Sequence, residues 1–162
     1  MGLPTAGQTL LTLVSLTTSF GCYLADWNDT HIYHPLWLPH AKFHNGQTMS
    51  MGLLLGFATL WYTFVPGALP ASLAQSKEKK AIVEVRQGKQ LERLRTAVLL
   101  GALYWVTQAS AYFYPGVAAF DHVPGREHEV HDPLLQAKLE AAMFVMLGGA
   151  WWLEKRRILS QA

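Results

Sequence analysis

The sequence predicts an all-α protein: an integral membrane four-helix bundle with up-down-up-down topology and both termini on the cytoplasmic side. Its 162 residues are 51% hydrophobic and 15% charged, against roughly 25% charged in soluble domains. Lys, Arg, Asp and Glu are absent from residues 1–25, 43–76, 96–120 and 141–153. The first three stretches reach the roughly 20 residues that a membrane-spanning helix needs, and the fourth does so when it is extended back to Leu134.

The first two helices are expected at about residues 8–24 and 43–64. The apolar start of the chain has neither the basic region nor the small-residue cleavage site of a signal peptide, so we interpret it as a retained first helix. The loop that follows contains Pro35 and Pro39, which prevent one continuous helix from running through it. The second helix is expected to end near Pro66.

A polar connection, expected to be partly helical, covers residues 71–92. The third helix is predicted at about 95–114, where a Pro-Gly pair stops it. The fourth is predicted at about 134–157, with Pro133 placed to start it. All four belong to a single transmembrane domain over residues 1–162.

The distribution of basic residues predicts the orientation. Ten of the thirteen Lys and Arg residues lie in or just after the central connection, within residues 77–95, or in the C-terminal tail, and only Lys42, Arg126 and Lys138 lie elsewhere. By the positive-inside rule the connection and both termini are cytoplasmic, in the endoplasmic reticulum if the protein is fungal or in the inner membrane if it is bacterial. The net charge of +2 then reflects topology and not nucleic-acid binding. The single Cys22 excludes an internal disulfide framework.

All seven histidines lie in residues 31–44 and 122–131. Polar side chains also recur at helical spacing on three of the expected helices, and such groups in spanning segments usually face the bundle interior. We therefore expect a pocket at the outer end. The second helix contributes His40, His44 and Gln47, the third contributes Tyr104, Gln108 and Tyr112, and the fourth contributes Gln136 and Glu140.

Two carboxylates are the candidate acid and base. Glu140 lies about two turns into the fourth helix, deeper than any other outer acid, and burial there favours a protonated carboxyl that acts as a general acid. Its alternative role is a structural carboxylate paired with His44, Lys42 or Lys138. Asp26 ends the first helix, where it is either a turn former or a catalytic group.

Metal binding is a second interpretation of the histidines. The pairs His31/His34, His40/His44 and His128/His131 have spacings that chelate zinc, but none matches the HExxH pattern. We expect neither a metal nor another cofactor.

The first outer loop and the start of the second helix resemble a known family. Asp26-Trp27-Asn28-x-Thr30-His31, followed by Pro35-x-Trp37-x-Pro39-His40-x-x-Phe43-His44-x-x-Gln47-Thr48, is similar to small four-helix membrane-bound epoxide hydrolases of fungal polyketide pathways of the aurovertin and citreoviridin type. The similar part spans about 25 residues. Those relatives have Asn-Pro-Arg where this chain has His34, Pro35 and Leu36, which favours a more apolar substrate here.

The resemblance implies an enzyme of secondary metabolism, a hydrolase acting on ether bonds, that opens or cyclises epoxides of a lipophilic polyketide-type substrate. General acid–base catalysis suffices for this reaction. Our hypothesis makes Asp26 and Glu140 the acid–base pair. In this hypothesis His31, His40 and His44 tune the pair. Asn28 and Gln47 position water. The residues that contact substrate are Trp27, Tyr104, Gln108 and Tyr112.

Two other classes of function stay open at this stage. One is a membrane isomerase of the sterol-isomerase kind, which would use the same acids to move a double bond. The other is a non-catalytic bundle that binds a lipid or sterol. The expected partners are a lipophilic small molecule and the lipid bilayer, without nucleic acid, and a homo-oligomer is left open.

Overall fold

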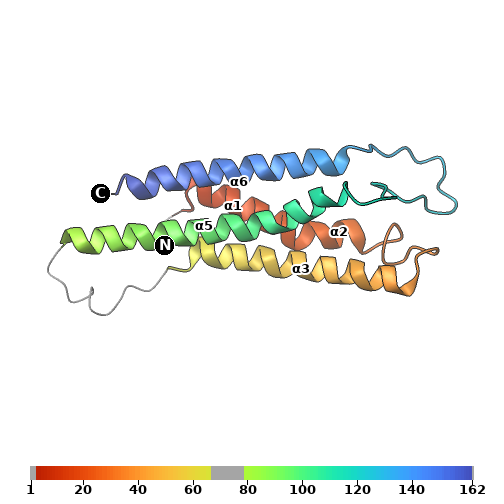
Figure 1. Ribbon diagram of the computed structural model, residues 1–162, viewed down its shortest axis with the longest axis horizontal. Helices are drawn as coiled ribbons and strands as arrows, with labels where there is room; N and C mark the ends of the chain where they lie inside the picture. The colour runs from red at the N-terminus through yellow and green to blue at the C-terminus, as the bar shows by residue number, and fades with distance from the viewer. Residues whose placement is uncertain (1–2, 67–78, 162) are drawn as a thin grey trace.

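The computed structural model describes residues 3–66 and 79–161, and the chain is helical without strands over these ranges. The elements are α1 (Ala6–Leu16), the π-helical segment η1 (Thr17–Gly21), α2 (Cys22–Asp26), α3 (Pro39–Phe64), α5 (Lys79–Ala111) and α6 (Leu135–Leu159). The first three follow one another without a break, so the described chain forms four rods (Figure 1). The predicted all-α bundle is confirmed.

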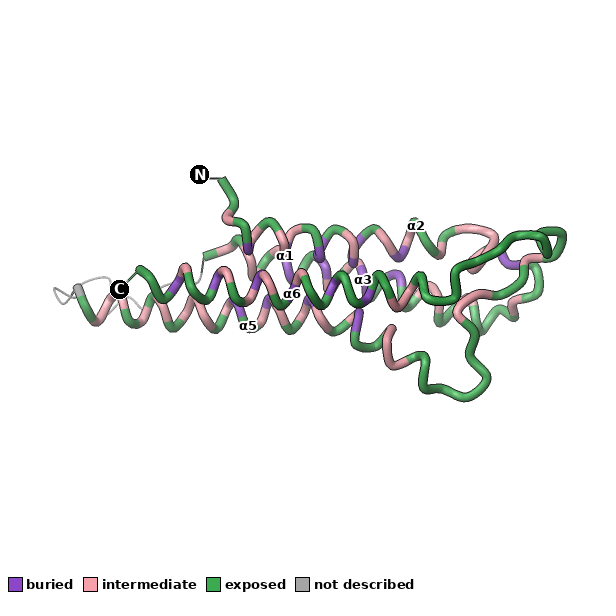
Figure 2. Tube along the Cα trace, turned by 90° about the horizontal axis from the view of Figure 1, so that it is seen from above, coloured by how far each residue is buried: buried purple, intermediate pink, exposed green. Residues whose placement is uncertain are grey.

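Successive rods run in opposite directions (Figure 1). The rod of α1, η1 and α2 packs on α3 and α6, and α5 packs between α3 and α6. The first and last described residues, Leu3 and Gln161, lie at one end, which we call the terminal end. The opposite end, the loop end, carries residues 27–38 and 112–134. In Figure 2 most buried residues lie along the four rods, and the second of these loops is almost wholly exposed.

Local chemistry sets most helix ends. At the start of α1 the Thr5 hydroxyl accepts from the Gln8 backbone and the Gln8 side chain accepts from the Thr5 backbone, a capping box. Pro39 occupies the first turn of α3, where its missing N–H costs nothing. Because residues preceding a proline avoid helical angles, α3 ends at Phe64, two residues before Pro66.

The third long helix is longer than predicted. It begins at Lys79 and not near residue 95, because the polar connection already places apolar side chains at helical spacing. Of these, Leu91 packs against the core, and Leu94, just after the connection, belongs to it. The remainder of the predicted connection, residues 71–78, lies outside the described residues.

The π-helical segment in the first rod was not predicted. Thr18 and Ser19 in this segment are fully buried, and the Trp105 indole of α5 donates to the Thr18 hydroxyl across 3.0 Å. A π-helical turn widens a helix locally and often occurs at functional sites. Here it brings two hydroxyl side chains into the bundle interior.

Glycines on α3 allow the first rod to approach closely. A Cβ at Gly56 would lie 2.0 Å from the Ser19 hydroxyl and 2.5 Å from the Ser15 carbonyl oxygen. A Cβ at Gly52 would lie 2.8 Å from the Thr18 carbonyl oxygen. Since backbone atoms cannot give way as a flexible side chain can, these two positions fix which face of α3 meets the first rod.

The predicted membrane topology is wrong. No helix within residues 3–66 and 79–161 is both long enough and apolar enough to cross a bilayer. The prediction relied on the absence of charged residues, but α3 also carries Gln47, Thr48 and Ser50, and such polar residues lower the hydropathy of an uncharged run. The multi-pass assignment, and with it placement in the endoplasmic reticulum or a bacterial inner membrane, is overturned by this finding.

Candidate functional site

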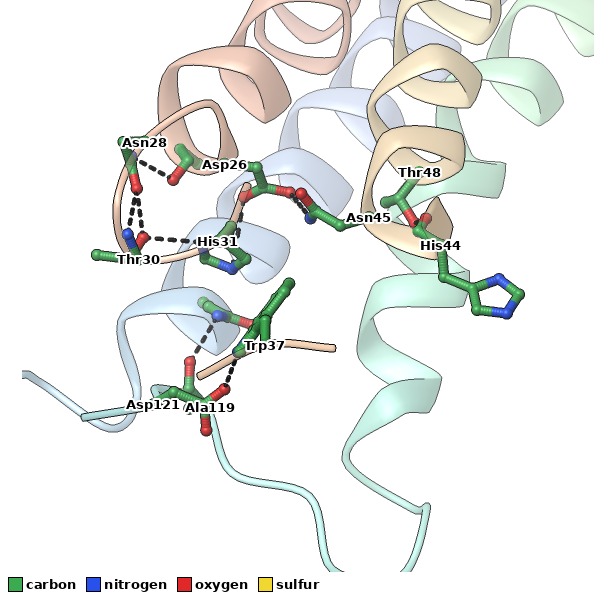
Figure 3. Close-up of polar contacts among 12 residues, drawn as sticks. Asp26, Asn28, Thr30, His31, Trp37, His44, Asn45, Thr48, Ala119 and Asp121 are labelled. Carbon is green, nitrogen blue, oxygen red and sulfur yellow. Dashed lines mark hydrogen bonds and ion pairs between the residues drawn. The ribbon is translucent and has the colours of Figure 1, made fainter. Parts of the chain in front are cut away.

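Asp26 is held in place by two side chains at the loop end. One carboxylate oxygen, Oδ2, accepts from the Asn45 side-chain amide at 2.8 Å. The other, Oδ1, lies 3.7 Å from His31 Nε2, an ion-pair distance longer than a hydrogen bond. The Asp26 side chain is 16% exposed. Figure 3 shows the carboxylate between the two partners, with His31 on the loop and Asn45 on α3.

The loop after α2 folds back because its own polar groups bond locally. The Asn28 amide nitrogen donates to the Ala25 carbonyl at 2.8 Å. The Asn28 carbonyl oxygen therefore faces the other way, where it accepts from the Thr30 backbone at 2.8 Å and from the Thr30 hydroxyl at 2.6 Å. The Ile32 backbone donates to the Asp26 carbonyl at 3.2 Å, which closes the turn and returns His31 to the carboxylate.

This arrangement determines which nitrogen of His31 carries a proton. The single Thr30 hydroxyl proton is given to Asn28, so at the 2.8 Å contact with His31 Nδ1 the hydroxyl oxygen accepts from an Nδ1–H. Nε2 is then the nitrogen that faces Asp26. His31 thus presents an unprotonated Nε2 to the Asp26 carboxyl group.

The two outer loops are tied together beside this network. The Trp37 indole donates to Asp121 Oδ2 at 2.8 Å, and its ring packs edge-on against His31 with ring centroids 5.1 Å apart (Figure 3). Arg126 forms an ion pair with Asp29. These contacts hold the second loop over the first, so both histidine-bearing segments lie at the same end.

His34 has a structural position in this junction. It is 2% exposed. Its Nδ1 accepts from the Leu36 backbone at 3.2 Å, so Nε2 carries the proton that is donated to the His122 carbonyl at 3.3 Å. Both ring nitrogens are therefore occupied in joining the loops.

Glu140 lies deeper in the bundle, on α6. It is 5% exposed, and its Oε1 is buried without a hydrogen-bond partner. Burial raises the pKa of this carboxyl above its usual value. The structural pairing considered from the sequence is not seen: Lys138 pairs with Asp132 at 2.7 Å, and the described residues show no ion pair to Glu140.

Tyr104 of α5 lies near Asp26 on the inner side. Burial raises the pKa of its hydroxyl well above the usual value, with smaller contributions in the same direction from Cys22 and Asp26. Its ring comes within 3.1 Å of the position that a Cβ on Gly52 would occupy. Tyr104 therefore keeps its hydroxyl proton.

Several predicted site residues lie elsewhere. The imidazoles of His40 and His44 contact each other at 3.0 Å on an exposed face of α3, and Gln47 is exposed as well. Trp27 is exposed and donates to the Tyr33 hydroxyl at 2.8 Å. Tyr112 is 40% exposed beyond the end of α5. Gln108, on α5, is partly buried.

The structure adds Asn45 to the site, which the sequence reasoning missed. The face of α3 that packs inward consists of Met49, Gly52, Gly56 and Thr59, and Asn45 continues this series by one step of four. His40, His44 and Gln47 follow an equally regular spacing on another face. The signal that separates the two faces is the glycine pair, since glycines mark the side where another backbone comes close.

The chelating spacings of the histidines do not lead to a metal site among the described residues. No three His, Cys, Asp or Glu side chains gather there in a way that could hold a metal ion. His40 and His44 are paired with each other, and both nitrogens of His34 are in use.

Comparison with known proteins identifies a family for this chain. A family model described as "Family of unknown function (DUF6640)" matches residues 10–162. No curated protein and no solved structure matches the chain.

Proposed function

We propose that this chain opens epoxides of a lipophilic polyketide-type substrate by acid–base catalysis. The chain belongs to the DUF6640 family of unknown function, because the family model spans residues 10–162. The observation that carries the proposal is the Asp26 carboxylate, oriented by Asn45 and His31, in the same bundle as the buried Glu140 carboxyl with its unpartnered oxygen.

Epoxide opening requires a base and an acid on opposite sides of the strained ring. The base removes a proton from the attacking water or substrate hydroxyl, and the acid protonates the departing oxygen. Asp26 suits the role of base because Asn45 fixes Oδ2, while Oδ1 accepts no hydrogen bond from the described residues and the side chain stays partly exposed. Glu140 suits the role of acid because burial favours its protonated form.

The antiparallel packing of α1 and α6 sets the axial separation of the two carboxyls. Gly7 of α1 faces Glu154 and Ala150 of α6, and Gly149 faces Leu10, so the two helices are antiparallel. Counting from these contacts places Glu140 beside η1, about two helical turns or roughly 10 Å from Asp26 along the bundle.

His31 and Tyr104 complete the proposed chemistry. After Asp26 accepts a proton, His31 Nε2 at 3.7 Å receives it or passes it to solvent. The Tyr104 hydroxyl donates a hydrogen bond to an oxygen atom of the substrate. The second outer loop covers this region through Trp37 and Arg126, so it must move aside to admit substrate.

The test measures turnover of a panel of lipophilic polyene epoxides by the purified chain in ¹⁸O-labelled water. Label in the product shows hydrolysis, and a cyclic product without label shows attack by a substrate hydroxyl. We expect Asp26→Asn and Glu140→Gln to lower kcat by at least 10²-fold and the exposed Glu129→Gln to leave it unchanged. Full activity in the first two variants refutes the assignment. A shifted double bond identifies an isomerase, and a bound but unaltered ligand identifies a binding protein.

A further inference from the structure

A second polar region lies at the terminal end, far from Asp26. A cavity of about 620 Å³ opens where α1 begins, α3 ends and α6 ends, with α5 passing along it. Volumes of about 300–1,000 Å³ are typical of small-molecule sites. The proposed chemistry at the loop end does not use this cavity.

Basic side chains dominate the polar part of its wall. Arg86, Lys89 and Arg93 follow one face of α5 at steps of three and four, and Arg157 faces them from α6. One carboxylate, Glu154, also lines the cavity. Four cations around a half-enclosed space repel one another, so an anion bound between them would be stabilised.

Glu154 pairs with one member of this group, Arg157. It is 4% exposed, and its Oε2 accepts from Arg157 Nε at 2.8 Å and Nη2 at 2.7 Å. Its other oxygen accepts from the Thr5 hydroxyl. The carboxylate is therefore committed to Arg157 and to the start of α1, and it forms no ion pair with Arg86 or Arg93.

The α5 arginines have donors to spare. Arg93 donates from Nη2 to the Trp61 carbonyl at 2.9 Å, and its guanidinium lies 5.0 Å from the centre of the Tyr62 ring. This fixes the orientation of the group, and to the described residues it gives one of its five N–H donors in a hydrogen bond. Among the described residues no carboxylate forms an ion pair with Arg86 or Arg93.

The floor of the cavity is apolar. Leu11, Leu94, Ala97 and Ile158 line it, and all four belong to the buried core. The Gln90 side chain also lines the cavity, and its Oε1 is buried without a hydrogen-bond partner. An acceptor left unpaired in this way costs free energy until a donor reaches it. The cavity thus combines a cationic rim, an apolar floor and one open acceptor.

From this combination we propose that the cavity binds an amphiphilic anion, with a carboxylate or phosphate head between Arg86, Arg93 and Lys89 and an apolar tail over Leu94 and Ala97. A hydroxyl near the head would donate to Gln90. The tail distinguishes this ligand from a free inorganic anion, and the charge distinguishes it from a neutral lipid.

The test is calorimetric titration of the full chain with decyl phosphate, decanoate, inorganic phosphate and decyltrimethylammonium, at concentrations where the amphiphiles are monomeric. We expect at least one decyl anion to bind and inorganic phosphate to bind at least tenfold more weakly. The decyl cation should not compete with the decyl anion for the cavity. The tighter of the two decyl anions identifies the head group. Equal binding of the decyl cation, or of inorganic phosphate, overturns the proposal.

Matched variants locate the site. Arg86→Gln and Arg93→Gln should each weaken binding of the decyl anion about tenfold, the effect of one charged hydrogen bond. Arg95→Gln changes a neighbouring exposed arginine that does not line the cavity and should leave binding within twofold. Because Arg86 is exposed, its replacement should leave the fold intact. Arg86→Gln therefore tests the site even if Arg93→Gln unfolds. Equal losses in Arg86→Gln and Arg95→Gln show surface attraction and overturn the proposal.

Discussion

Asn45 donates its side-chain amide to Asp26 across 2.8 Å and thereby joins α3 to the end of the first rod. The two residues are 19 positions apart in the sequence. The other amide atom, Asn45 Oδ1, is buried and has no hydrogen-bond partner. Asn45 is therefore buried with only part of its amide hydrogen-bonded, and the bond that it does form orients the Asp26 carboxylate, as expected of a positioning residue.

The first prediction concerns Asn45→Leu. The variant loses the hydrogen bond to Asp26, so we expect kcat on an epoxide substrate to fall about tenfold while KM changes little, and the free energy of unfolding to fall by about 1 kcal/mol. Steady-state kinetics and urea unfolding measure the two effects. Asn45→Gln serves as the conservative variant, because its amide can still donate to Asp26, and it should recover part of kcat. Loss of stability with unchanged kcat would make the Asn45 contact purely structural.

The second prediction concerns the pH dependence of stability. Burial raises the pKa of Glu140 above its usual value of 4.5 in the folded chain. The folded state therefore holds this proton more tightly, and the stabilisation is complete below pH 4.5 and is lost as the pH rises through the folded pKa. Each unit of pKa difference corresponds to about 1.4 kcal/mol.

Glu140→Gln removes this titration. In urea unfolding between pH 4 and pH 8, the variant should gain stability relative to the parent chain as the pH rises. Glu129→Gln, at an exposed carboxylate, is the control and should follow the parent. Parallel curves for Glu140→Gln and the parent would contradict the buried, protonated carboxyl.

The third prediction compares two glycines of α3. Gly56→Ala places a methyl group 2.5 Å from the Ser15 carbonyl oxygen, so it should lower the free energy of unfolding by about 1–3 kcal/mol. Gly46→Ala has no atom within 4 Å of the new Cβ, and in a helix it should stabilise by about 0.5–1 kcal/mol. Thermal or urea unfolding measures both. Equal effects of the two substitutions would show that helix propensity, and not packing against the first rod, determines the outcome.

The sequence predicted the helices where local signals are strong. Pro39 and Pro66 bound α3 and the Thr5 capping box starts α1, so these boundaries lie within a few residues of the expected ones. Other features depend on tertiary contacts. The π-helical segment accompanies a hydrogen bond between Thr18 and Trp105, which lie far apart in the sequence. The early start of α5 depends on the burial of Leu94.

The candidate site was predicted in part for the same reason. Asp26, His31 and Asn28 are close in sequence, and the structure brings them into one network. The choice between two faces of α3 could not be made from spacing alone, because His40 and Asn45 both lie on regular helical stripes. Packing against the first rod turned Asn45 inward and left His40 exposed. The membrane topology failed because an uncharged helix need not be apolar enough to span a bilayer.

The last prediction tests the cover over the site. Trp37→Phe keeps an aromatic ring beside His31 but removes the indole N–H that donates to Asp121. The second outer loop should then open more often, so hydrogen exchange across residues 112–134 should become faster while the free energy of global unfolding falls by about 1 kcal/mol or less. Trp27→Phe is the matched control, because its indole bonds to Tyr33 within the first loop. If faster exchange admits substrate, KM should fall with Trp37→Phe and not with Trp27→Phe. Equal exchange in both variants would mean that the bond between Trp37 and Asp121 does not hold the loop over Asp26.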